Sequence, residues 1–259
     1  MTASARIEAD ASGRCTMLRF QPPLTFRETG PGEVHLVGTA AGPVGGDRLR
    51  VELAVAAGGS LVVRGAAASL VHPGPTGAPS SLEIDVDVGA GARLCWLAPP
   101  TVLIDGCDHT VTTTIRLGVG AGLVWSEAVA LGRHGEPSGS MLQRLRIDRE
   151  DQPLLRTEAA LGPGWPGAAG PAVTAGARVF ASQVIVDDQL TRPATAADCR
   201  CGLAEAAQSS VVELAPGCRL TTALAPSFTA LGHALGRPEP RHASPSSARS
   251  AGDPTWEPR

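Results

Sequence analysis

The 259-residue chain contains no lysine, no asparagine and no tyrosine, and only 3% of its residues are aromatic. Walker-type phosphate loops, Schiff-base enzymes and kinases all need a lysine ammonium group, so these classes are excluded. All 22 basic residues are therefore arginine. Because aromatics are scarce, aliphatic side chains must fill the core, and stacking platforms for sugars are not expected.

The chain also lacks a strong net charge and long apolar runs. A net charge of −3 and a pI near 6.1 argue against a nucleic-acid partner, which requires a concentrated basic surface. No stretch approaches the roughly 18 apolar residues of a membrane helix, and the beginning of the chain lacks the apolar run of a signal peptide. We expect a cytoplasmic protein that binds neither nucleic acid nor membranes.

Motifs of catalysis and of tight cofactor binding are missing from the sequence as well. It holds no H-E-x-x-H motif, EF-hand loop or nucleophile elbow, and its six histidines are scattered singly. The segment 162–167 matches G-x-G-x-x-G by its letters, but Pro166 stands where the helix of a dinucleotide site would begin. We therefore expect no enzyme and no tightly bound cofactor.

Six cysteines are present, and in a cytoplasmic protein they are expected to be mostly reduced. Cys199 and Cys201 form a C-x-C pair, and Cys107 lies in an Asp-Gly-Cys-Asp-His run. Neither arrangement has the four-ligand spacing of a structural zinc site. A metal-binding protein that uses Cys199 and Cys201 stays open as an alternative.

A strict period-two alternation runs through Leu82–Val88, where apolar and acidic residues take turns. This pattern predicts a strand with one buried and one wet face. The strand ends at a glycine-containing turn, and similar turns recur with an aliphatic residue, a glycine three positions later and a leucine three positions after that. The four copies are Val55–Leu61, Val88–Leu94, Leu117–Leu123 and Leu214–Leu220.

Recurrence at this spacing is typical of stacked architectures, in which each unit buries its apolar face against its neighbour. Chance matches in a glycine- and alanine-rich β chain are the alternative. We predict a mainly β protein with a stacked, β-helix-like body and a small helical C-terminal part.

The organisation along the chain follows from the same patterns. Residues 1–17 are expected to be a lead-in, mobile or forming a first short strand, and residues 18–236 a single β-rich domain. Helical segments are predicted near 195–235, in the alanine-rich Thr195–Ser209 and in Thr221–Leu235, where apolar residues follow helical spacing. The polar residues 237–259 are expected to be a disordered tail.

Two stretches are not explained by core packing. In Val44-Gly-Gly-Asp-Arg-Leu49, the pair Gly45 and Gly46 suits a tight turn in which Asp47 accepts from backbone N–H groups and Arg48 pairs outward. A purely structural turn explains this segment equally well.

The second stretch is the apolar run that begins at Trp125, which Glu127 interrupts. A buried carboxylate needs a partner, and Arg133 is near enough in the sequence to be one. A solvated glutamate on a half-exposed strand is the alternative.

These stretches resemble the UreD family (also called UreH), accessory proteins of urease maturation. The resemblance covers roughly residues 20 to 160 in unbroken order. It is carried by Val44–Leu49, Gly91–Pro99 with the following Ile104-Asp-Gly, Trp125-Ser-Glu, Leu131-Gly-Arg133 and Gly135-Glu136.

The resemblance implies a non-enzymatic scaffold that binds the urease apoprotein and UreF, and through UreF the GTPase UreG, in a complex that delivers nickel. It also implies a passage for transient Ni²⁺. Because Ni²⁺ accepts carboxylate and imidazole ligands, the candidates here are Asp47, Glu127, Glu136 and His109, with Arg133 in a structural role. The alternative from another class is a β-solenoid carbohydrate-binding module or enzyme.

Overall fold

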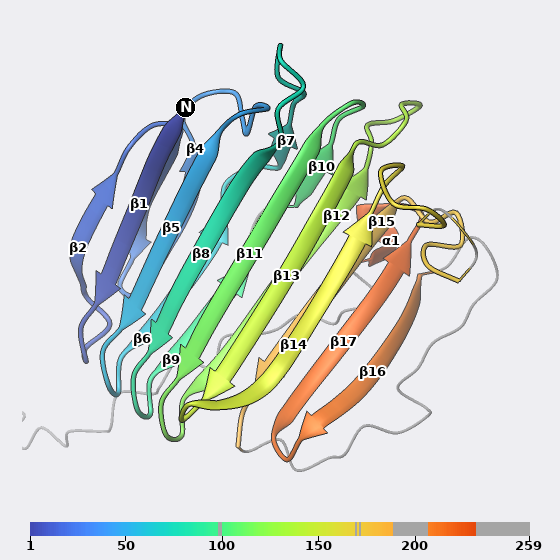
Figure 1. Ribbon diagram of the computed structural model, residues 1–259. Helices are drawn as coiled ribbons and strands as arrows, with labels where there is room; N and C mark the ends of the chain where they lie inside the picture. Colours follow the sequence, from blue (N-terminus) through green and yellow to red (C-terminus); the bar gives the residue numbers. More distant parts are fainter. Residues whose placement is uncertain (98–99, 169, 171, 189–206, 232–259) are drawn as a thin grey trace, which may run out of the picture.

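The computed structural model describes residues 1–97, 100–168, 170, 172–188 and 207–231. Two β-sheets lie face to face and run the length of the molecule (Figure 1). The sheet in front in Figure 1 has seven strands. In spatial order they are β14 (Gln152–Leu161), β13 (Ser140–Arg149), β11 (Asp108–Leu117), β8 (Ser80–Val88), β5 (Arg48–Val55), β1 (Thr2–Ala9) and β2 (Cys15–Phe20).

The second sheet has ten strands and ends next to a short helix, α1 (Phe228–Leu231). Its main path is β16 (Gln208–Ala215), β17 (Cys218–Ala225), β15 (Val179–Val186), β12 (Gly122–Leu131), β9 (Arg93–Leu97), β6 (Ser60–Gly65), β4 (Glu33–Gly38) and β3 (Leu24–Gly30). Two short strands, β7 (Ser69–Val71) and β10 (Thr101–Leu103), pair beside β12.

The chain passes repeatedly from one sheet to the other. It goes from β5 to β6, from β8 to β9 and from β11 to β12, and each pass adds one parallel strand to each sheet. Toward the ends of each sheet the strands pair antiparallel, for example β14 with β13, and β15 with both β12 and β17. The predicted stack of strands is confirmed.

The recurring glycine turns are the corners of this stack. Gly58, Gly91 and Gly120 have φ values of 73°, 64° and 63°, a conformation that side chains with a Cβ rarely adopt. The fourth copy, around Gly217 with φ 72°, makes the hairpin between β16 and β17 within one sheet. The recurrence therefore marks three corners and one hairpin.

The core fills the space between the two sheets. In the seven-stranded sheet, residues in register form one inward-facing aliphatic row: Ile7, Leu53, Val86, Ile115 and Ile147. From the other sheet, Trp96 and Trp125 stack with ring centroids 4.7 Å apart and are almost fully buried. These two tryptophans are therefore core residues and cannot offer a surface to a sugar.

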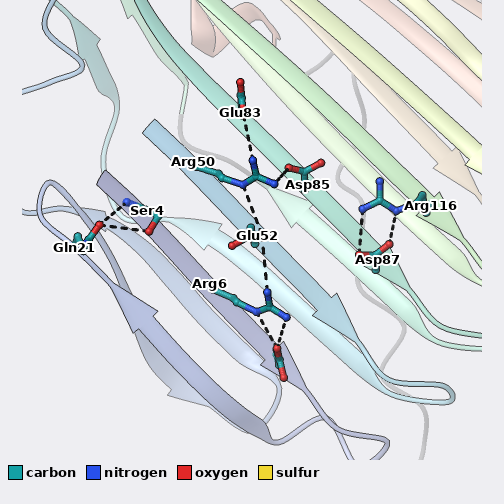
Figure 2. Close-up of polar contacts among 10 residues, drawn as sticks. Ser4, Arg6, Gln21, Arg50, Glu52, Glu83, Asp85, Asp87 and Arg116 are labelled. Atoms are coloured by element: carbon teal, nitrogen blue, oxygen red, sulfur yellow. Dashed lines mark hydrogen bonds and ion pairs between the residues drawn. The ribbon is translucent and has the colours of Figure 1, made fainter. Parts of the chain in front are cut away.

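The outer face of the seven-stranded sheet carries a ladder of opposite charges (Figure 2). Arg50 contacts Glu83 at 3.4 Å and Asp85 at 2.7 Å, and Arg116 pairs with Asp87 at 2.6 Å. Exposed pairs of this kind contribute at most about 1 kcal/mol each. Their main effect is local charge balance, so these arginines form no isolated basic patch.

Two expectations near the ends of the chain have structural outcomes. Residues 2–9 form β1, a strand inside the sheet between β2 and β5, so of the two forms expected for the lead-in the strand is the one observed. The predicted helix at 221–235 is wrong at its start, because residues 221–225 belong to β17; of the part that the structure describes, up to residue 231, Phe228–Leu231 is helical. Cross-strand pairing of β17 with β15 outweighs the helical spacing.

The other predictions near the C-terminal end have no structural outcome. Of the alanine-rich segment, residues 208–209 lie in β16, whereas residues 195–206 and the predicted tail at 237–259 lie outside the described residues. Within the part of the chain that the structure describes, no helix has the length and apolar character of a membrane span.

Candidate functional site

A cavity of about 290 Å³ lies between the two sheets. Most of its lining is aliphatic, from β5, β8, β11 and β13 on one side and from residues 36–43 and 67–70. The side chains with nitrogen or oxygen groups in this lining are those of Ser69, His72, Trp96, Thr101, His109, Glu127 and Gln143. The cavity thus combines an apolar wall with a few polar groups, the usual composition of a ligand site.

His109 lies near the start of β11 and is only 1% exposed. Its Nδ1 is 2.8 Å from the Ser80 hydroxyl, which itself donates to the Asp108 carbonyl at 3.4 Å. We infer that Nδ1 carries the proton, which leaves the lone pair of Nε2 free. Burial lowers the pKa of His109 to about 4, so the imidazole is neutral near pH 7 and able to bind a metal ion.

Glu127 and Gln143 face each other from opposite sheets. Glu127 is on the inner face of β12, Gln143 is on the inner face of β13, and the Gln143 amide donates to the Glu127 carboxylate. Burial raises the pKa of Glu127 to about 7, although the hydrogen bond from Gln143 opposes this shift. The partner of Glu127 is thus Gln143 and not Arg133.

A second, smaller cavity of about 40 Å³ adjoins this pair. The two cavities share only Glu127 and Gln143 among their lining residues. The smaller cavity is also lined by three hydroxyl side chains, those of Thr157, Ser182 and Thr222. The hydrogen-bonded pair therefore separates a mostly aliphatic space from a partly hydroxylated one.

Asp47 lies in the turn that the paired glycines make, and it does not line either cavity. Its carboxylate accepts from the Met1 ammonium group and from the Val44 N–H, both at 2.9 Å. Burial by itself would raise the pKa of Asp47, but these two hydrogen bonds outweigh it and lower the pKa. The predicted acceptor role of Asp47 toward a backbone N–H is confirmed, while Arg48 is exposed.

Glu136 is in the connection between β12 and β13 and is paired with Arg133 through two hydrogen bonds of 2.7 and 2.9 Å. The hydrogen bond from Arg133 lowers the pKa of Glu136. Arg178 ties the same connection down by donating to the carbonyl oxygens of Arg133 and Glu136. Glu136 is thus engaged in holding a loop, away from the residues that line the cavities.

Of the four predicted metal candidates, the structure brings Glu127 and His109 to one cavity. Gln143 was not singled out from the sequence, although it interrupts the buried apolar positions Met141, Leu145 and Ile147 of β13. That interruption of a period-two pattern is the signal that could have found it.

Among the described residues, no three or more His, Cys, Asp or Glu side chains gather in a group that could hold a metal ion. Cys95, Cys107 and Cys218 are buried free thiols, and burial raises the pKa of each to about 11. Cys199 and Cys201 lie outside the described residues. The larger cavity is lined by two imidazoles, those of His72 and His109, and by the Glu127 carboxylate, but these three side chains do not gather into one ligand group, which suits weak binding.

The turn at Asp47 gives a stability prediction. Replacing Asp47 with Asn is expected to lower the free energy of unfolding by about 1.5 to 3 kcal/mol near neutral pH, because a charged acceptor of two hydrogen bonds is lost. The effect should fade as the pH falls below about 4 and wild-type Asp47 becomes protonated.

Urea unfolding at several pH values measures this difference. Asp87→Asn, which removes an exposed carboxylate from a pair with Arg116, is the matched control and should change stability little. Equal effects of the two substitutions would contradict the role of Asp47.

Comparison with known proteins places this chain in a family. The family model described as UreD urease accessory protein matches residues 4–238, a wider range than the 20 to 160 of the resemblance. Urease accessory protein UreD of Parafrankia sp. (strain EAN1pec) is 40% identical over 209 residues, covering 71% of this chain and 70% of that protein. The protein of the same name from Streptomyces avermitilis is 37% identical over 242 residues, covering 90% of this chain and 94% of its own length. The chain therefore belongs to the UreD family of urease accessory proteins.

Proposed function

We propose that this protein is a scaffold of urease maturation that acts in the cytoplasm and is not itself an enzyme. It binds the urease apoprotein and UreF, is joined by UreG through UreF, and assists the delivery of nickel to the urease active site. The observation that carries the nickel role is the placement of His109 and Glu127 around one interior cavity. Membership of the family supports the maturation role.

The chemistry of the cavity fits transfer better than storage. Imidazole and carboxylate groups are ligands that Ni²⁺ accepts, but His72, His109 and Glu127 do not gather into one group, so most coordination positions of an ion are left to water. An ion in such a place is bound weakly and can move on. Glu127 has a pKa of about 7, so a proton competes with the metal near neutral pH and weakens binding further.

The other two predicted acids have a different part in this proposal. Asp47 and Glu136 are each bound to a cationic group of the protein, the Met1 ammonium and the Arg133 guanidinium. We assign ion contact to His109 and Glu127, and loop stabilisation to Asp47 and Glu136.

The test of the function is co-expression of this chain with a urease operon that lacks its own UreD-type gene. We expect restored urease activity and bound nickel in the purified urease. Soluble expression and binding to UreF without restored activity would overturn the proposal.

The same system tests the assignment of the acids. Glu127→Gln keeps the side-chain size but replaces a charged carboxylate ligand with a neutral and weaker amide, so we expect the nickel content of urease to fall by about tenfold. The matched control is Glu136→Gln, which should leave nickel delivery unchanged. Equal nickel content with both variants would contradict an ion-contacting role for Glu127.

A further inference from the structure

The contact between Glu127 and Gln143 spans the interior from one sheet to the other. Every second residue of β12 points inward, and Glu127 follows the buried Trp125 in that row and precedes Val129. On β13, Gln143 takes the equivalent inward place between Met141 and Leu145. One hydrogen-bonded polar pair thus joins the two sheets across a mostly apolar layer.

Beyond this pair, toward β14, β15 and β17, the interior is lined by hydroxyl groups as well as by aliphatic side chains. Glu127 is in register with Ser182 of β15, and Ser182 is in register with Thr222 of β17. From the facing sheet, Thr157 of β14 is in register with Leu145, one inward position beyond Gln143. The three hydroxyl groups line the smaller cavity, so polar oxygens continue from Glu127 toward the C-terminal end of the stack.

We propose that Gln143 is the gate between these two cavities, and that its side-chain amide controls passage of a small divalent cation past Glu127. The identity of the ion rests on the proposed function. The gate itself is inferred from geometry: two cavities lie next to each other, and the one hydrogen bond between Glu127 and Gln143 lies between them. In the closed state the amide N–H group occupies Oε2 of the Glu127 carboxylate, so a cation cannot coordinate both carboxylate oxygens.

A glutamine is suited to this place because its amide carries both a donor and an acceptor. When a cation reaches Glu127, the amide group turns, the N–H group leaves the carboxylate, and the amide oxygen can coordinate the same ion. Two oxygen ligands from opposite sheets then hold the cation briefly between the cavities. Oxygen ligands of this kind bind nickel-like divalent cations more weakly than thiolates do.

Two substitutions of Gln143 test two different effects: one should block the passage between the cavities, and the other should hold a cation at Glu127. Gln143→Leu removes the amide oxygen and leaves an apolar side chain in the passage, so passage should be blocked. Gln143→Glu places a second carboxylate opposite Glu127, so a cation should be held there. Gln183→Leu is the matched control, because Gln183 is 3% exposed and bonds Ser126 at 2.9 Å but lines neither cavity.

The first measurement is the nickel content of urease matured with each variant in the co-expression system. Gln143→Leu is expected to lower it by about tenfold, whereas Gln183→Leu leaves it unchanged. The second measurement is Co²⁺ binding to the purified full chain by equilibrium dialysis. Gln143→Glu is expected to bind Co²⁺ about tenfold more tightly than the wild type, and adding Glu127→Gln to it should abolish the gain.

The outcomes keep the gate distinct from the proposed function. If the wild-type chain fails to activate urease, the proposed function is contradicted. The dialysis experiment still tests the proposed gate. If Gln143→Leu does not fold, the dialysis of Gln143→Glu also decides alone. Nickel delivery by a folded Gln143→Leu variant at the level of Gln183→Leu, or Co²⁺ affinity of Gln143→Glu no higher than that of the wild type, would overturn the proposal.

Discussion

Replacing Gly45 with alanine is expected to lower the free energy of unfolding by about 3 kcal/mol or more. A Cβ at this position would lie 2.3 Å from the Gly74 nitrogen and 2.7 Å from the Ala78 carbonyl oxygen, both of them backbone atoms. The two segments cannot separate cheaply, because the Gly45 N–H donates to the carbonyl of His72 at 2.9 Å. The turn of the Gly-Gly-Asp-Arg motif is therefore packed backbone against backbone.

Urea unfolding of Gly45→Ala measures this cost, and the control is Gly30→Ala. A Cβ at Gly30 would meet its nearest neighbour only at 4.0 Å, and Gly30 has no positive φ. The control should be close to neutral. Gly74→Ala is expected to match Gly45→Ala, because its Cβ would lie 2.3 Å from the Gly45 carbonyl oxygen. Stability of Gly45→Ala equal to that of Gly30→Ala would show that the two loops move apart freely.

Glu127 makes the stability of the wild-type protein depend on pH. Its carboxyl group has a pKa of about 7 in the folded chain and an ordinary value of 4.5 when unfolded, so the folded state binds its proton more tightly. Stability from this group is fully present below about pH 4.5 and is lost as the pH rises toward 7. The loss is on the order of 3 kcal/mol, since each pKa unit corresponds to about 1.4 kcal/mol.

Glu127→Gln should remove this dependence, because the amide does not titrate. The difference in unfolding free energy between variant and wild type is expected to move in favour of the variant as the pH rises from about 4.5 to 7. Urea unfolding at closely spaced pH values measures it. Glu136→Gln should show no trend over this range, because the pKa of Glu136 is lowered and its contribution to stability changes only as the pH falls below about 4.5. A pH-independent difference for Glu127→Gln would contradict burial of this carboxyl group.

The stacked strands and their corners could be predicted because their signals are local. The alternation through Leu82–Val88 indicates a strand with one buried face, and the glycine that follows it marks the left-handed turn at Gly91. The same reasoning found the corners at Gly58 and Gly120. Each of these signals lies within about seven residues of the chain.

The C-terminal strand and the partner of Glu127 could not be predicted, because both depend on contacts between residues that are distant in the sequence. Helical spacing from Leu224 to Leu231 suggested a helix, but strand pairing with β15 decides the structure up to Ala225. Arg133 was the nearest cation in sequence to Glu127, yet the fold places Gln143 from the facing sheet against it. Sequence spacing along one strand does not predict which side chains two different sheets bring together.

The parallel pairing of β1 with β5 has a consequence for the order of folding. Thr2 pairs with Arg48 and Ala9 with Val55, so the partner of β1 leaves the ribosome about 46 residues later. At roughly 5 to 20 residues per second, this delay lasts on the order of seconds. During that time β1 can pair only with β2, and its other edge stays open to wrong partners. Slow translation between β2 and β5 would therefore prolong the period in which the nascent chain is most prone to aggregate.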